Sequence, residues 1–335
     1  MAYTLDFERP LADIDRQIQA LQKKGERLKP EEVQQLERLK QRLQRTTEEI
    51  YKHLTPWQTV QVARHPGRPH AIDYVKLMCE EFFELRGDRA FGENASIFGG
   101  PARLDGQTVM FLCQEKGREM KERRDRNAGQ PHPEGFRKAH RLMEQAEKFN
   151  MPLICLVDTP GASIALDDEE RGQSQAIAAN LYLMARLRVP IVAVVIGEGG
   201  SGGALALSIG DRILMLENSY YSVASPESAA TILLRDAKHA ATMAEAMQVS
   251  ARQLKNLGII DELVPEPLGG AHQNYQAAAD LVKEALLTNL EELSKLSPEQ
   301  LAEQRYQKYR AIGPVGTLTP APAPTALPSS SSSSS

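Results

Sequence analysis

The sequence predicts an α/β fold built around a mostly parallel sheet whose two faces are covered. Two apolar segments, 151–157 and 189–196, each begin near a proline and run into a glycine-bearing turn. A helical pattern over 168–188 separates them, and a third strand is expected at 212–216. Continuous apolar strands alternating with helices are typical of buried parallel sheets. Ligands of such sheets bind beyond the carboxyl ends of the strands, where both glycine-bearing turns are expected.

Composition and charge restrict the class of protein. The chain has 335 residues, 25% charged side chains and a formal net charge of −4, which suits a globular protein and argues against a dedicated nucleic-acid binder. No apolar run is longer than the one from Ile191 to Ile196, and a membrane span needs about 20 residues, so none is predicted. The three cysteines, Cys79, Cys113 and Cys155, are widely separated, so neither a disulfide nor a cysteine-type zinc site is expected in this chain.

The first residues carry no recognisable targeting signal. Residues 1–8 lack the basic and apolar regions of a secretory signal, and they lack the Arg- and Ser-rich character of a transit peptide. The expected location is therefore cytoplasmic. The plastid stroma stays open as an alternative for a chain that has lost its transit peptide.

Two helices are predicted before the sheet. Apolar residues recur at helical spacing on both sides of a break at 25–30. The two seams comprise Leu11, Ile14, Ile18 and Leu21, and then Leu36, Leu39, Leu43 and Ile50. They are too short for a long coiled coil, so we interpret the hairpin as an arm that packs on its own domain or on a partner subunit. An independent scaffold is the alternative.

A β-hairpin is predicted next, from strand-like runs at 96–104 and 108–114 on either side of Asp105-Gly106. This dipeptide is typical of tight hairpin turns. A basic loop at 116–126 and a helix at 133–149 follow. Further helical patterns occupy 240–247, 271–287 and 298–309, and the uncharged, proline- and serine-rich segment 314–335 is expected to be disordered.

The glycine run at 197–203 is the most informative local feature, because five of its seven residues are glycine and it lies between a buried strand and a helical start. Such a run indicates positive φ angles or the close approach of another group to the main chain. Packing of the helix on the sheet is the structural alternative. Backbone amides at the start of a helix lack intrahelical partners, so the run favours an oxyanion hole.

Three other interpretations of these turns are disfavoured. The spacing of Gly197, Gly199 and Gly202 matches a dinucleotide fingerprint, but only about two helical turns fit before Gly210. The segment 158–161 looks like a GTPase element, yet the phosphate-binding loop that a GTPase needs upstream is missing from the sequence. Nucleophilic chemistry at Ser201 lacks a partner that spacing identifies.

The loop at 116–126 carries six cations and three acids. Mixed-charge runs usually form a solvated face. The alternative is a site for the phosphates of a nucleotide-like ligand such as coenzyme A, for which Lys and Arg are natural donors. The sequence leaves both interpretations open.

Eight short motifs are spread along residues 3–311. They are Ala63-Arg-His-Pro, Gln114-Glu-Lys116-Gly-Arg118, Pro133-Glu-Gly-Phe-Arg-Lys138, Asp158-Thr-Pro-Gly-Ala162, Glu170-Arg-Gly-Gln-Ser174, Gly197-Glu-Gly-Gly-Ser-Gly-Gly-Ala204, Ser225-Pro-Glu227 and Pro265-Glu-Pro-Leu-Gly-Gly-Ala-His272. In this order they closely resemble the carboxyltransferase α subunits of the multisubunit acetyl-CoA carboxylases of bacteria and plastids.

The resemblance implies a crotonase-like ββα spiral over 56–312, preceded by a helical region at 1–55 and followed by a disordered tail at 313–335. It also implies an active site shared with a β subunit in an α2β2 heterotetramer. In this family the β subunit carries a zinc ribbon and most acetyl-CoA contacts, so no metal is expected here. The implied reaction moves the carboxyl group of carboxybiotin, held on a biotin carboxyl carrier protein charged by ATP-dependent biotin carboxylase, to acetyl-CoA. The product is malonyl-CoA, and the step commits carbon to fatty acid synthesis.

The same resemblance assigns roles to individual residues. The backbone amides of Gly202 and Gly203 are the implied oxyanion hole. The residues assigned to substrate or biotin binding are Gly161, Ala162, Gly199, Gly200, Ser201, Lys116 and Arg118. In the family's usual scheme decarboxylated biotin takes the substrate proton, which explains why backbone donors matter more than a side-chain base.

The chain departs from the family pattern at two places. Residues 163–168 read Ser-Ile-Ala-Leu-Asp-Asp where an aromatic residue and a glycine are usual, and Ser228 stands where glycine is usual. An active α subunit remains the favoured interpretation because the glycine run is intact. The alternatives are a carboxyltransferase for another acyl-CoA, such as propionyl-CoA, and a non-catalytic scaffold or regulatory paralogue.

Overall fold

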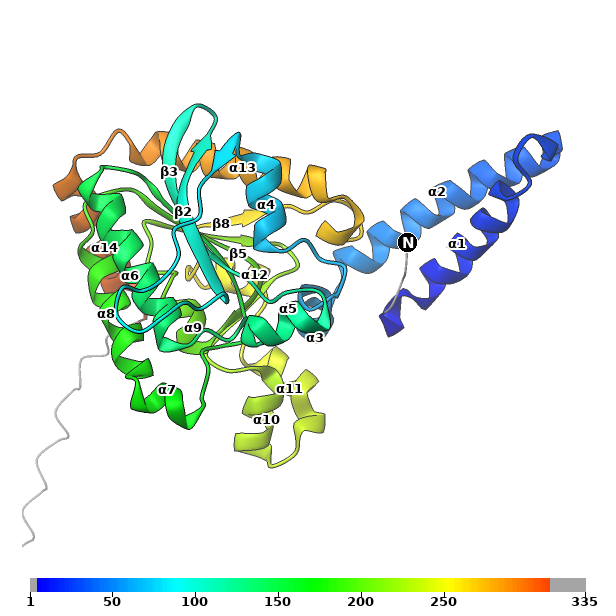
Figure 1. The fold of residues 1–335 in the computed structure, drawn as a ribbon. Helices are drawn as coiled ribbons and strands as arrows, with labels where there is room; N and C mark the ends of the chain where they lie inside the picture. Colours follow the sequence, from blue (N-terminus) through cyan, green and yellow to red (C-terminus); the bar gives the residue numbers. More distant parts are fainter. Residues whose placement is uncertain (1–4, 314–335) are drawn as a thin grey trace, which may run out of the picture.

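One mixed sheet forms the centre of the protein (Figure 1). The computed structural model describes residues 5–313, and the strands of this range follow the order β1-β2-β3-β4-β5-β6-β8, with β7 paired to β5. The strands are β1 Glu81–Phe82, β2 Ile97–Leu104, β3 Gln107–Gln114, β4 Leu153–Thr159, β5 Ile191–Gly200, β6 Arg212–Leu216, β7 Tyr220–Ser222 and β8 Glu262–Val264.

The predicted hairpin and the predicted parallel strands are both confirmed. β2 and β3 pair antiparallel up to Leu104 and Gln107, and the turn residues Asp105 and Gly106 have φ of 51° and 76°, as a tight turn of this kind requires. β3–β4, β4–β5, β5–β6 and β6–β8 all pair parallel. The carboxyl ends of β4 and β5 therefore lie side by side at one edge of the sheet.

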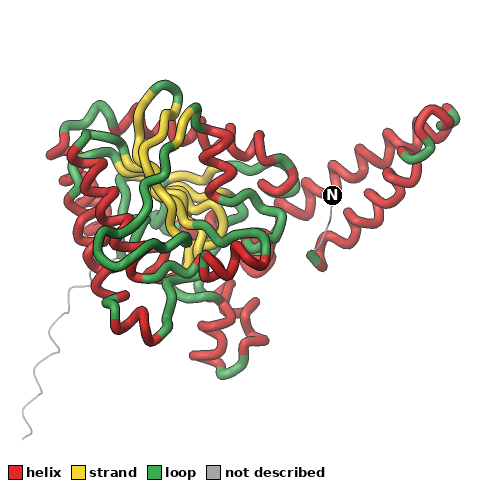
Figure 2. Tube along the Cα trace, viewed as in Figure 1, coloured by secondary structure: helices red, strands yellow, loops and turns green. Residues whose placement is uncertain are grey.

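Helices cover both faces of the sheet (Figure 2). Side chains alternate along β4, so that Ile154 packs in the core beneath α4 (Ala71–Met78) and α13 (Tyr275–Leu293). Its neighbour Cys155 packs in the opposite core beneath α6 (Pro133–Lys148) and α8 (Gln173–Arg186). Cys113 lies in the first core, so the sheet separates it from Cys155, and all three cysteines are free. Because both faces are covered, the strands are continuous apolar runs.

Three local predictions were wrong in detail. The helix expected over 168–188 is divided into α7 (Leu166–Glu170) and α8, because Gly172 between them has φ of 82°. The glycine run is not wholly a turn: β5 continues through Gly200, where it pairs with β7, and α9 (Ser201–Leu205) begins at once. The loop at 116–126 contains a short helix, α5 (Met120–Asp125).

The N-terminal helices form the predicted hairpin, which extends away from the body in Figure 1. α1 (Arg9–Gln22) and α2 (Pro30–Lys52) bury Ile14, Ile18 and Leu36 between them. At the base of this arm Leu11 and Tyr51 pack on Val62 of α3 (Pro56–Ala63). The apolar seams are therefore used to join the two helices and to anchor them on the body.

Further helices complete the described chain. α10 (Pro226–Leu234) and α11 (Ala240–Ala246) lie side by side and project from the body at the bottom of Figure 1. α12 is Ala251–Asn256, and α14 is Pro298–Ala311. No helix within residues 5–313 is both long and apolar enough to cross a membrane. The tail expected at 314–335 lies outside the described residues.

Candidate active site

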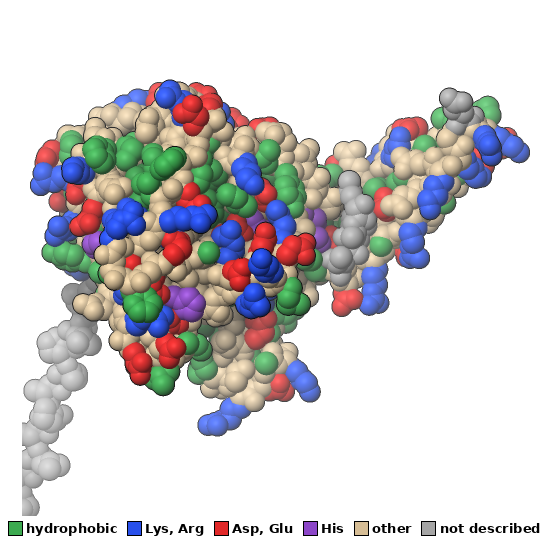
Figure 3. Space-filling model, in the orientation of Figure 1, with side chains coloured by type: hydrophobic (Ala, Val, Ile, Leu, Met, Phe, Trp, Pro, Cys, Tyr) green, Lys and Arg blue, Asp and Glu red, His purple; other side chains and the backbone are tan. Residues whose placement is uncertain are grey.

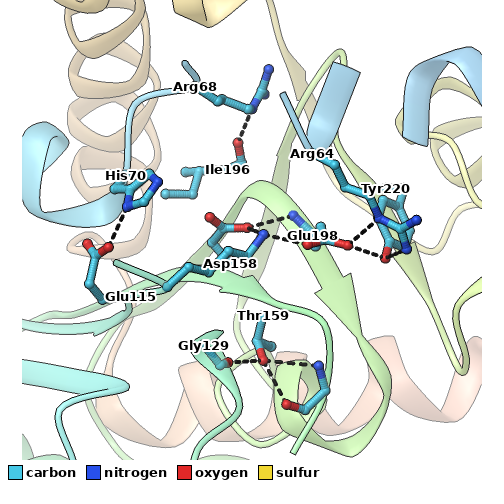
Figure 4. A network of polar contacts seen from close by, with 12 residues as sticks. Arg64, Arg68, His70, Glu115, Gly129, Asp158, Thr159, Ile196, Glu198 and Tyr220 are labelled. Atoms are coloured by element: carbon cyan, nitrogen blue, oxygen red, sulfur yellow. Dashed lines mark hydrogen bonds and ion pairs between the residues drawn. The ribbon is translucent and has the colours of Figure 1, made fainter. Parts of the chain in front are cut away.

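The two predicted glycine-bearing turns meet at the carboxyl edge of the sheet. Thr159, the last residue of β4, is in register with Gly199 of β5. The loop after β4, Pro160 to Ala162, therefore lies against the glycine run that ends β5 and begins α9. Thr159 fixes this loop: its hydroxyl donates to the Gly129 carbonyl (2.6 Å) and accepts from the Gly161 amide (3.1 Å) (Figure 4).

Glycine is required at two positions of the run because the two backbones touch. A Cβ added at Gly200 would lie 2.2 Å from the Pro160 carbonyl oxygen, and one at Gly203 would lie 2.5 Å from the Ala162 nitrogen. Gly202 differs, since the nearest atom to its added Cβ is 3.7 Å away. The run thus lets the loop after β4 approach the first turn of α9 at backbone contact distance.

The first turn of α9 supplies backbone donors next to this junction. Gly202 and Gly203 occupy its second and third positions, where helix geometry leaves amides without an intrahelical acceptor. The side-chain amide Nε2 of Gln114, the last residue of β3, donates to the Gly203 carbonyl (2.7 Å) and holds this turn in place. Ser201 opens the helix with φ of 55°, a left-handed conformation that is costly for a side chain other than glycine. Such a turn has the chemistry to stabilise an oxyanion.

An apolar cavity of about 490 Å³ opens beside Ser201 and Gly202. The rest of its wall is mostly apolar and comes from α9, β7, α12 and the residues that follow β7, α11 and α12. These wall residues are Leu205, Tyr221, Ser222, Val223, Met247, Leu254 and Ile259. The cavity therefore has one polar end, formed by the start of α9, and a predominantly apolar wall.

A polar network lies next to the loop after β4 and the glycine run, and it borders a second cavity of about 400 Å³ (Figure 4). Lys116 Nζ is 2.6 Å from Asp158 Oδ1 and 2.6 Å from Glu198 Oε2. On its other side Glu198 accepts from Arg64 Nε (2.6 Å) and from the Tyr220 hydroxyl (2.8 Å). Arg64 also pairs with Glu227 at the start of α10. We call these residues, Lys116, Asp158, Glu198, Arg64, Tyr220 and Glu227, the polar network.

Within the network, Glu198 and Lys116 are held in their charged forms and Tyr220 in its neutral form. Burial would raise the pKa of Glu198, but Lys116 and Arg64 outweigh it and hold that pKa at about 2. Burial would lower the pKa of Lys116, but Asp158 and Glu198 raise it above its ordinary value. Burial raises the pKa of Tyr220 far above its ordinary value, so its hydroxyl stays protonated and donates.

The predicted site residues divide into two groups. Gly161, Ala162 and the run from Gly199 to Gly203 come together at the junction of the two loops. Lys116 lies behind them in the polar network, and Arg118 pairs with Asp73 at the rim of the polar cavity. Both cations are thus already paired with carboxylates, and their predicted contact with substrate stays a prediction.

The two departures from the family pattern have plain structural settings. Ile164 and Leu166 are 96% and 70% exposed, whereas Asp168 is buried and pairs with His132 and Arg171. Ser228 has a helical backbone, and its amide donates to the Ser225 hydroxyl that caps α10. A glycine is therefore not needed at Ser228.

Sequence reasoning missed Glu198 and Arg64 as members of the site. The only signal for Glu198 was a carboxylate placed inside a glycine run at the end of a buried strand. Arg64 is separated from Glu198 by 134 residues, and only the folded chain brings the two together. Across residues 5–313, no group of three or more His, Cys, Asp or Glu side chains is arranged to hold a metal ion.

Comparison with known proteins places these features in a family. A family model described as acetyl co-enzyme A carboxylase carboxyltransferase-like matches residues 4–313. The chain is 49% identical to the acetyl-coenzyme A carboxylase carboxyl transferase subunit alpha of Halorhodospira halophila. The alignment spans 309 residues and covers 92% of this chain and 97% of that protein. The chain is 50% identical to the protein of the same name from Methylococcus capsulatus, with 92% and 96% covered.

Solved structures show the same fold at low sequence identity. Transcarboxylase 12S superposes with a TM-score of 0.56 at 18% identity, covering 68% of this chain and 42% of that chain. A Pseudomonas malonate decarboxylase hetero-dimer superposes with a TM-score of 0.57 at 21% identity, covering 73% and 96%. The α/β fold of this chain is therefore crotonase-like, as the sequence motifs implied.

Proposed function

Because the chain belongs to the family of acetyl-CoA carboxylase carboxyltransferase α subunits, we propose that its glycine run forms one half of a carboxyltransferase site that a β subunit completes. The chain is a transferase component of acetyl-CoA carboxylase. The single observation that carries the proposal for the site is the backbone contact of Gly200 and Gly203 with the loop after β4, which fixes the start of α9 where Ser201 and Gly202 line a cavity.

The amides of Gly202 and Gly203 are the proposed oxyanion donors. Removing the methyl proton of a thioester creates an enolate oxygen that needs donors fixed in advance. Gln114 supplies that rigidity from behind by holding the Gly203 carbonyl. The site needs no side-chain nucleophile, which agrees with the lack of a partner for Ser201.

The apolar cavity fits the biotin group chemically. A biotin ring presents an apolar face and a polar ureido edge, and the cavity offers an apolar wall with Ser201 and Gly202 at one end. Gly161, Ala162, Gly199 and Gly200 shape that end by their packing, and we assign them to biotin binding in this sense. Lys116 and Arg118 border the polar cavity on the other side of the loop.

Carboxybiotin would supply the carboxyl group as CO₂ and, once decarboxylated, a ring nitrogen that accepts the methyl proton of acetyl-CoA, whose enolate would then take up the CO₂ at the methyl carbon. The residues of this chain bind and orient the reacting groups and stabilise the oxyanion. The product is malonyl-CoA, and its formation is the committed step of fatty acid synthesis.

Exposed apolar side chains around the site support a β subunit as partner. Ile164 and Leu166 follow the loop after β4, and Ile232 and Leu233 lie on α10. Large exposed apolar side chains near a site are typical of protein interfaces. We propose an α2β2 heterotetramer in which the β subunit brings the zinc and most acetyl-CoA contacts. A biotin carboxyl carrier protein and a biotin carboxylase complete the system.

The proposed location is the cytoplasm, with the plastid stroma as the alternative. Nucleic acid is not a proposed partner: acidic and basic side chains are interspersed over the face drawn in Figure 3, and the net charge is −4. A nucleic-acid binder is expected to carry a basic surface.

Co-expression with a zinc-ribbon β subunit tests the proposal. The purified mixture is supplied with free carboxybiotin and either acetyl-CoA or propionyl-CoA, and the carboxylated products are measured. We expect malonyl-CoA, with the higher kcat/KM for acetyl-CoA. A preference for propionyl-CoA would support the alternative acyl-CoA, and a stable complex without turnover would support the scaffold alternative.

A further inference from the structure

Two buried carboxylates stand side by side where the two loops of the site begin. Asp158 precedes Gly161 by three residues, and Glu198 precedes Gly202 by four. Both side chains are 9% exposed, and the Glu198 amide donates to Asp158 Oδ1 (2.8 Å). Two buried like charges this close repel each other unless a cation balances them. Any repulsion here acts directly on the spacing of the two loops.

Lys116 is shared by both carboxylates. Its Nζ lies 2.6 Å from each of them, and its side chain is 14% exposed. It follows β3, the strand next to β4, so it reaches the strand ends from the sheet itself. Among the described residues, it is the one cation that forms ion pairs with both Asp158 and Glu198.

The other charged groups near the pair are already balanced. Arg64 contacts Glu198 but divides its charge with Glu227. Arg68 faces Asp158 but is held by Glu266. The tyrosines that face the pair are protonated, since burial raises the pKa of both far above the ordinary value. They are Tyr74 and Tyr220.

We propose that Lys116 is a positioning residue for carboxyl transfer: it neutralises Asp158 and Glu198 together and thereby sets the spacing between the loop after β4 and the glycine run. Contact between Lys116 and substrate is not needed for this role. The effect of Lys116 on carboxyl transfer rests on the proposed function, whereas its effect on the spacing of the two loops concerns this chain alone.

The spacing between the loop after β4 and the glycine run matters because the two are already in backbone contact. Gly203 already lies so close to Gly161 and Ala162 that a single added methyl group would overlap them. A displacement of about 1 Å in a catalytic group costs on the order of 100-fold in rate. Separation of the carboxylates would therefore misplace the amides of Gly202 and Gly203 without touching them.

Removal of Lys116 gives a signature that depends on pH. In the wild type, burial would raise the pKa of Glu198, but the adjacent cations hold it at about 2, so Glu198 stays ionised above pH 5. In K116M that pKa rises. At low pH protonation of Glu198 weakens its repulsion of Asp158; as the pH rises the proton leaves Glu198, the charges repel, and the loops separate.

The experiment compares K116M, K116R and K116M/E198Q, with K76M as the matched control, since Lys76 is exposed on α4. Amide hydrogen exchange of 158–165 and 198–206 is measured on the full-length chain, and kcat on its complex with a β subunit, from pH 6 to 8.5. We expect K116M to speed exchange at both loops at least tenfold. Its kcat should fall at least 100-fold at pH 8.5 and less at pH 6, with the KM for acetyl-CoA little changed.

The rescue variants separate positioning from general damage. K116R and K116M/E198Q restore the charge balance by different routes, so both should recover slow exchange and a flat pH profile. Unchanged exchange in K116M would overturn the inference, as would a loss of kcat that is equal at every pH and not recovered by E198Q. If K116M does not fold, a folded K116M/E198Q with wild-type exchange supports the inference, and one that also fails to fold refutes it. If the variants show the expected hydrogen-exchange rates but the wild-type complex makes no malonyl-CoA, the proposed function is refuted and the structural role of Lys116 stands.

Discussion

Replacing Gly203 by alanine tests the contact between the two loops most sharply. The added Cβ would lie 2.5 Å from the Ala162 nitrogen, whereas ordinary contact begins at 3.4 Å, so the loop must retreat by about 0.9 Å. Overpacking of this kind costs about 1–3 kcal/mol of stability. Because the same movement displaces the proposed oxyanion donors, we expect kcat to fall on the order of 100-fold.

The assay has two matched controls. Gly202→Ala adds the same methyl group one residue earlier, where the nearest atom is 3.7 Å away, so its free energy of unfolding should not decrease. Gly92→Ala places a methyl group in open space away from the site and should leave both stability and rate unchanged. Urea unfolding, malonyl-CoA formation and gel filtration with the β subunit are measured for each variant. Wild-type rate and stability in Gly203→Ala would refute the packing argument.

Three further predictions concern stability. The pKa of Glu198 is lowered from 4.5 to about 2, because adjacent cations outweigh burial. The ionised Glu198 therefore stabilises the fold by roughly 3 kcal/mol above pH 4.5, and this stabilisation is lost as the pH falls towards 2. Urea unfolding at pH 3 and pH 7 should show the lower stability at pH 3, and E198Q should lack this dependence on pH. Arg68 donates to both oxygens of buried Glu266, so Arg68→Met should cost about 3–5 kcal/mol in the same assay, and a cost below about 1 kcal/mol would contradict the pairing. Ser201→Gly should raise the unfolding free energy by roughly 0.5–1 kcal/mol, because it relieves the φ of 55° at the expense of some chain entropy; a lower melting temperature would argue against strain.

The elements with strong local signals could be predicted from the sequence. The apolar seams predicted the N-terminal helical hairpin, and Asp105-Gly106 predicted the β-hairpin. The apolar runs that begin near a proline predicted β4 and β5. Each signal is a periodicity or a turn preference within a few residues. The break at Gly172 was missed because a lone glycine is compatible with a helix, and only packing decides its φ.

The candidate site was predictable only in part. The glycine run indicated a close backbone approach, and the structure identifies the loop after β4 as its partner. The polar network was not predictable, because Arg64, Lys116 and Glu198 come from distant segments and a charged residue in isolation usually marks a solvated surface. Its buried ion pairs exist only because the parallel strands bring their carboxyl ends together.

Titration of the chain with a zinc-ribbon β subunit tests the central claim most directly. The chain is held at a fixed concentration with carboxybiotin and acetyl-CoA in excess, and the rate of malonyl-CoA formation is followed as the β subunit is added. A site shared by the two chains predicts no product from either chain alone and a rate that saturates at equimolar amounts. Full activity of the β subunit by itself, or a complex that forms at equimolar amounts and makes no malonyl-CoA, would contradict it.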